Sequence, residues 1–88
     1  MSGYKLLLQK QFSRQVKALR QERNLTQEEM SEQLHITSRA YSDLERGRSC
    51  CSALALLFFL LMLKSDELEE FLNRLRKQIR LFEQKEAA

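Results

Sequence analysis

Apolar residues recur along this chain at helical spacing, which predicts helices from one end to the other. Between about residues 4 and 23 they follow one another at intervals of four, four and three, on one side of a helix: Leu8, Phe12, Val16 and Leu19. Asn24 stands where this helix would end, and asparagine tolerates the left-handed conformation of such an end.

Two short helices are predicted next, over residues 27–34 and 38–46, with a three-residue turn between them. Thr26 can cap the first of them, and Glu29 stands at capping-box spacing from it. Gly47 suits a left-handed end for the second. The positions expected to be buried are Met30, Leu34, Ile36, Tyr41 and Leu44. Such a pair of helices is a helix-turn-helix pattern.

The last third of the chain predicts two more helices. Ser52 can cap a fourth over residues 53–63, which is apolar on every side and too short to span a bilayer. After a polar joint at residues 64–66, a fifth helix from 67 to about 85 carries a 4-3-4-3 seam: Leu68, Leu72, Leu75, Ile79 and Phe82. We therefore expect one all-α domain over residues 1–88, with a helix-turn-helix core at about 12–63 and a dimerisation helix at about 66–85.

Composition agrees with an all-helical protein, because the 88 residues include no proline and only two glycines. Cys50 and Cys51 are adjacent, which excludes a spaced disulfide framework, and no signal-peptide pattern opens the chain, so we expect a cytoplasmic protein. The net charge of +3 is uneven: residues 1–24 carry six basic side chains against one acid, whereas residues 49–88 balance six against six.

Two segments carry a family resemblance. Leu-Thr-Gln-Glu-Glu at 25–29 and Leu-Glu-Arg-Gly-Arg at 44–48, within a stretch of roughly residues 12–63, resemble the Cro/phage-repressor-type helix-turn-helix family, also called xenobiotic-response-element regulators. The resemblance implies a lambda-repressor-like five-helix fold that binds double-stranded DNA without a cofactor or metal, and a place at the nucleoid when DNA is bound.

The resemblance also implies roles for individual residues. Base-reading positions are Ser38, Arg39, Ser42 and Asp43, and phosphate-contacting positions are Gln27, Thr37, Arg46 and Arg48. Arg20 and Glu45 match a pair that joins the first helix to the third in this family. Two residues depart from the pattern: His35 replaces the usual turn glycine, and Tyr41 replaces a smaller aliphatic residue, so its hydroxyl needs space or a partner.

Elementary chemistry supports the same surface. Arginine is the side chain best suited to a two-pronged contact with guanine, which favours Arg39 as a base reader. Asp43 could accept a hydrogen bond from cytosine, or it could pair with Arg39 four residues before it; the spacing favours the pair. The basic segment 74–80 reads more simply as a solvated helix face than as an auxiliary DNA contact.

Three classes of function are compatible with the sequence. The leading one is a homodimeric repressor, with the interface on the last two helices: Leu54, Phe58, Leu61, Leu68, Phe71, Leu72, Leu75, Ile79 and Phe82. The fifth helix could instead fold back on the fourth, although that would scarcely cover the whole seam. The second class is an antitoxin-like or anti-repressor module that holds another protein, such as a toxin or a regulator, and the third is a purely structural helical oligomer.

No enzyme class finds support in the sequence. His35 is the single histidine, without a second ligand or a catalytic partner in the pattern, and no phosphate-binding loop is present. Cys50 and Cys51 are expected to be loop thiols rather than a redox switch.

Overall fold

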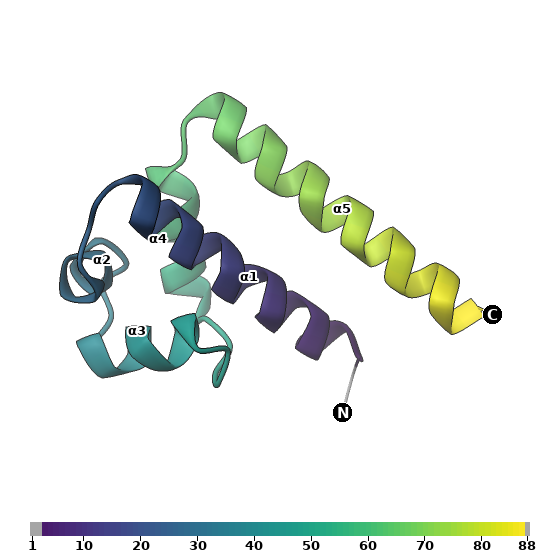
Figure 1. Ribbon diagram of the computed structural model, residues 1–88, viewed down its shortest axis with the longest axis horizontal. Helices are drawn as coiled ribbons and strands as arrows, with labels where there is room; N and C mark the ends of the chain where they lie inside the picture. Colours follow the sequence, from purple (N-terminus) through teal and green to yellow (C-terminus); the bar gives the residue numbers. More distant parts are fainter. Residues whose placement is uncertain (1–2, 88) are drawn as a thin grey trace.

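The computed structural model describes residues 3–87, which form five α-helices. They are α1 (Gly3–Glu22), α2 (Gln27–Gln33), α3 (Ser38–Glu45), α4 (Ala53–Met62) and α5 (Ser65–Ala87). Figure 1 shows α1 and α5 side by side in opposite directions, with α2 and α3 on the other side of α1. The all-helical architecture predicted from the sequence is confirmed.

Local side-chain chemistry sets the helix ends. Thr26 Oγ1 accepts from the Glu29 N–H at 3.0 Å, and Glu29 Oε1 accepts from the Thr26 N–H at 2.9 Å, which completes the capping box. Thr37 and Ser52 cap α3 and α4 in the same way through one hydrogen bond each. Positive φ values occur at Asn24, His35 and Gly47. The predicted breaks are therefore real, and His35 takes the left-handed conformation in place of a glycine.

The start of α5 differs from the prediction. This helix begins at Ser65, two residues before the expected start at Glu67. The reason is a cap: Glu67 Oε1 accepts from the Lys64 backbone N–H at 2.8 Å, which satisfies a free donor at the helix start and closes the first turn earlier.

The hydrophobic core is centred on Phe59 of α4. Its ring meets Phe12 edge-on at 5.0 Å between centroids and Phe71 at 5.3 Å, so α1, α4 and α5 share one core. The buried apolar residues are Phe12, Val16, Leu19, Met30, Leu34, Tyr41, Leu44, Ala55, Phe59 and Phe71. Leu8 is the exception among the predicted core positions of α1, since 39 % of it remains exposed.

Helix α5 lies along α1 within the same chain. Polar contacts join the two helices at three levels: Tyr4 to Glu83, Arg74 to Gln15 and Arg23 to Glu67, at 2.9, 3.1 and 2.7 Å. At the far end the Phe82 ring packs against Tyr4, and Gly3 makes room for it, because a Cβ atom there would lie 2.5 Å from Phe82 Cζ.

This packing differs from the expectation that the α5 seam lies open for a partner. Phe71 is only 4 % exposed, because the core of its own chain covers it. Leu68, Leu75, Ile79 and Phe82 are half-buried, and Leu72 is 36 % exposed. The expected alternative, α5 folded back on α4, is only part of the arrangement, since α1 supplies most of the surface that α5 meets.

Within the part of the chain that the structure describes, no helix combines the length and the apolar composition needed to cross a membrane.

Candidate nucleic-acid interface

Helix α3 has one buried side and one accessible side. Tyr41 and Leu44 face the core with 0 % and 2 % of their surface exposed. The opposite side carries the four predicted base-reading residues: Ser38 and Arg39 are exposed, and Ser42 and Asp43 are partly exposed. A short polar helix face of this kind has the dimensions that fit a major groove.

Three arginines at this surface are unpaired. Among residues 3–86, no side chain forms an ion pair or hydrogen bond with the guanidinium of Arg39, Arg46 or Arg48. The i,i+4 ion pair that the spacing favoured between Arg39 and Asp43 is absent there. Each guanidinium therefore keeps its full set of donors for another acceptor.

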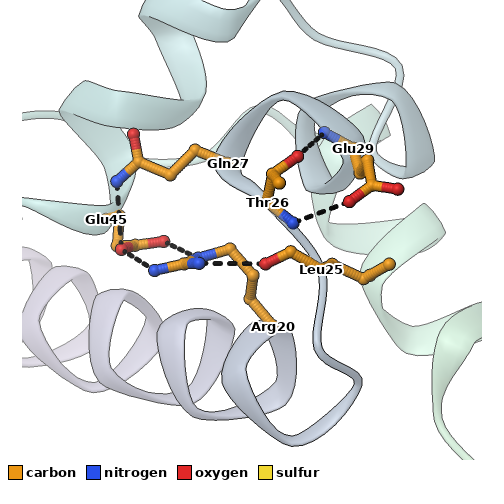
Figure 2. A network of polar contacts seen from close by, with 6 residues as sticks. All are labelled: Arg20, Leu25, Thr26, Gln27, Glu29 and Glu45. Carbon is orange, nitrogen blue, oxygen red and sulfur yellow. Dashed lines mark hydrogen bonds and ion pairs between the residues drawn. The ribbon is translucent and has the colours of Figure 1, made fainter.

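A partly buried polar network fixes the C-terminal end of α3 (Figure 2). Arg20 Nε donates to Glu45 Oε2 at 2.8 Å and Arg20 Nη2 donates to Glu45 Oε1 at 2.9 Å, a two-pronged ion pair. Arg20 Nη1 also donates to the Leu25 carbonyl at 3.0 Å, and Gln27 Nε2 donates to Glu45 Oε1 at 3.2 Å. Three of these contacts tie α3 to α1 and α2, and the fourth ties α1 to the loop between α1 and α2.

The pair remains ionised at neutral pH. Burial alone would raise the pKa of Glu45, but the hydrogen bonds from Arg20 and Gln27, together with the positive charge of Arg20, bring it below its ordinary value. The hydrogen bond to Glu45 likewise raises the pKa of Arg20. The side chains are 16 % and 6 % exposed, so both charges are largely removed from water.

Tyr41 brings an unsatisfied hydroxyl to the same place. This oxygen is buried and has no hydrogen-bond partner in the described part of the chain. Burial raises the pKa of Tyr41 far above its usual range, and the nearby carboxylate of Glu45 acts in the same direction. The core therefore provides the space that this ring needs, but within the described residues it provides no hydrogen bond of good geometry for the hydroxyl.

The predicted phosphate-contacting residues surround α3. Gln27 and Thr37 stand at the starts of α2 and α3, whereas Arg46 and Arg48 follow the end of α3. Thr37 Oγ1 accepts from the Ala40 N–H at 3.0 Å, which leaves its own O–H free to donate. Gln27 is exposed and braces Glu45, so one of its two amide donors is in use.

Intramolecular ion pairs use part of the positive charge at the start of the sequence. Arg20 of α1 pairs with Glu45, and Arg23, which follows α1, pairs with Glu67. The other four basic residues of this region are exposed: Lys5, Lys10, Arg14 and Lys17. The charge excess at the start of the sequence is therefore smaller at the surface than the count of residues indicates.

Several contacts near α3 were not predicted. The His35 ring lies over Phe58 with 4.0 Å between centroids, and Gln9 Nε2 donates to the Gly47 carbonyl at 2.6 Å. No sequence pattern could have revealed the Gln9 contact, which depends on how the helices pack.

The exposure of Leu57 on α4 was not predicted either. Leu57 is 58 % exposed and lies between Leu54 and Leu61 at helical spacing, a periodicity that could have identified it.

The part of the chain that the structure describes contains no group of three His, Cys, Asp or Glu side chains placed to hold a metal ion.

Comparison with known protein families gives a match over the helix-turn-helix region. A family model described as helix-turn-helix matches residues 16–57, which run from the middle of α1 through α2 and α3 into α4. Neither the curated proteins nor the solved structures gave a match. The match contains every element of the network around Glu45 and the whole polar side of α3. Residues 16–57 therefore match a DNA-binding helix-turn-helix domain of the Cro/phage-repressor type, a domain with the lambda-repressor-like all-α fold.

Proposed function

We propose that this protein is a homodimeric repressor that reads an inverted-repeat operator through the major groove. The observation that carries the proposal is the unpaired Arg39 in the first turn of α3, beside Ser38, Ser42 and Asp43 on the accessible side. The network at Glu45 holds the other end of the helix, so α3 presents this side on a fixed support.

The proposal gives the residues two kinds of role. Arg39 reads a guanine through O6 and N7, and the unpaired carboxylate of Asp43 is able to accept from a cytosine amino group. Gln27, Thr37, Arg46 and Arg48 contact backbone phosphates on either side of the groove, which sets the register of α3 without carrying sequence information.

The proposed dimer interface is the outer side of α4. Leu54, Leu57 and Leu61 are 53, 58 and 77 % exposed and recur at helical spacing, so they form one apolar stripe in a chain whose α5 seam is half-buried. A second copy buries such a stripe symmetrically. Two copies place two recognition helices about 34 Å apart on successive turns of the groove, which one short helix cannot achieve alone.

The base-reading role is tested with sites selected from a random DNA pool. We expect Arg39→Ala to weaken binding to the selected site by about 1–3 kcal/mol and to flatten the preference at one base pair. Equal weakening on all single-base variants of that site would make Arg39 a phosphate contact instead.

The phosphate contacts are tested by salt dependence. Arg46→Ala and Arg48→Ala are each expected to weaken binding to all sequences alike and to lower the slope of log K against log[salt] by about one unit. Arg80→Ala, which removes an exposed arginine of α5, is the matched control and should leave the slope unchanged. A slope that does not move in the α3 variants would contradict their role.

The dimer is tested by sedimentation at micromolar concentration. The wild-type chain should sediment at twice the monomer mass of 10.5 kDa, and Leu61→Glu should sediment as a folded monomer with weak operator binding. A wild-type monomer that binds its site tightly would refute the dimer. A monomer that binds no DNA would favour the antitoxin-like alternative, in which the α4 stripe holds a different protein.

A further inference from the structure

A cavity of about 320 Å³ lies between α1, α5 and the loop that joins α3 to α4. Most of its wall consists of apolar side chains: Leu8, Phe12, Leu44, Leu56, Phe71 and Leu75. Lys5, Gln9, Cys50 and Cys51 complete the lining. Apolar walls with a few polar groups are typical of small-molecule sites, and this volume lies at the small end of their range of about 300–1,000 Å³.

The cavity explains why Leu8 departs from its prediction. Helical spacing directs Leu8 to the core side of α1, together with Phe12, yet 39 % of it remains exposed. Leu8 lines the cavity, and so does Leu75 on the facing helix, which is half-buried. The space between them is apolar and is not filled by the side chains of residues 3–86, in contrast to the tight packing normal for a protein core.

The charge of the lining indicates the kind of ligand. Lys5 is the one charged residue among those that line the cavity, and its ammonium group has no partner in residues 3–86. Burial raises the pKa of the Cys51 thiol, so this side chain remains neutral. We propose that the cavity binds a small molecule with an apolar body and a carboxylate, the body between α1 and α5 and the carboxylate against Lys5.

The cavity also contacts the end of the recognition helix. Leu44, in the last turn of α3, forms part of the wall. Gln9 joins the wall to the following loop, because its Nε2 donates to the Gly47 carbonyl at 2.6 Å and its Oε1 accepts from Cys50 Sγ at 3.1 Å. A ligand in the cavity therefore lies against both the last turn of α3 and the loop that follows it.

Binding is tested on the full chain with hexanoate, octanoate and decanoate, and with decanol as the neutral match to decanoate. Affinity should rise from hexanoate to decanoate, and the amide resonances of Leu44, Gly47 and Cys51 should shift in ¹H–¹⁵N spectra. Lys5→Gln should weaken decanoate binding about two- to fivefold and leave decanol binding unchanged. Lys10→Gln, an exposed lysine outside the lining, is the matched control.

A pair of filling variants tests the location. Leu8→Phe adds volume inside the cavity and should abolish decanoate binding, whereas Leu6→Phe adds the same volume at an exposed position outside the lining and should not. Leu75→Phe fills the cavity from the α5 side if Leu8→Phe does not fold. Failure of all three alkanoates to bind, or equal binding by the filled and control variants, would overturn the proposal. Equal affinity for decanol and decanoate in the wild type would overturn the carboxylate. None of these readouts requires DNA, so their outcome is separate from that of the repressor proposal.

Discussion

Removing one partner of the Arg20–Glu45 pair should cost more stability than removing both. In Glu45→Met the guanidinium of Arg20 loses two of its three hydrogen bonds and remains only 16 % exposed. Removing one partner of a buried ion pair typically costs about 3–5 kcal/mol. Because the side chain of Arg20 keeps some exposure to water, we expect the lower end of this range, about 3 kcal/mol. For a domain of this size, that loss lowers the melting temperature by about 12–24 °C.

The double variant Arg20→Met, Glu45→Met should recover part of this loss, because neither charge is then buried alone. We expect it to cost about 1–2 kcal/mol, mainly from the part-buried Leu25 carbonyl that loses its donor. Urea unfolding followed by far-ultraviolet circular dichroism gives the four free energies of the cycle.

The exposed Arg74–Glu70 pair on α5 is the matched control. Its side chains are 54 % and 62 % exposed, so its coupling energy should be no more than about 0.5 kcal/mol. If the Arg20 and Glu45 substitutions add simply, with no coupling, the account of the network as a buried support for α3 is wrong.

The same pair predicts a dependence on pH. The pKa of Glu45 is lower in the folded chain than in the unfolded one, so its contribution is present above the unfolded pKa and is lost as pH falls through the folded value. Starting from an unfolded pKa of about 4.3, the coupling energy measured at pH 7 should therefore shrink in unfolding experiments at successively lower pH. A coupling that stays constant under acid conditions would show that the charge of Glu45 is not responsible.

Two further substitutions test the core. Tyr41→Phe removes a buried hydroxyl without a partner and should raise the free energy of unfolding by about 1 kcal/mol. Because the pKa of Tyr41 is raised in the folded chain, the wild type should also lose stability above about pH 10, where the variant loses less; unfolding curves at pH 8 and 11 compare them. Phe71→Ala should cost about 3–5 kcal/mol in denaturant unfolding, since this ring packs on Phe59, and a cost below 1 kcal/mol would mean that α5 does not share the core.

The helix ends and the orientation of α3 could be predicted because local chemistry decides them. Asn24, Thr26 and Gly47 act on backbone groups a few residues away, so their effect does not depend on the rest of the fold. The accessible side of α3 follows from helical spacing once Tyr41 and Leu44 are assigned to the core. For the same reason, the capping box appears in the structure as the sequence indicates.

The packing of α5 could not be predicted in this way. Its apolar seam shows that one side must be covered, but the seam does not identify the covering surface. In the structure this surface is largely α1, and the most exposed leucines of the two helices are Leu54, Leu57 and Leu61 of α4. Leu8 shows the same limit: spacing gives the direction of a side chain, whereas the cavity in front of it depends on how closely two distant helices approach.

The antiparallel contact between α1 and α5 has a consequence for the order of folding. Tyr4 and Glu83 are separated by 79 positions, and Arg23 and Glu67 by 44, whereas Arg20 and Glu45 are only 25 apart. Closing longer loops costs more chain entropy, so we expect α1–α4 to associate before α5 docks. The same helix should be the first to open in the native state, with faster amide exchange than α1. In that interval Phe59 faces water, and the chain is most exposed to association with its neighbours.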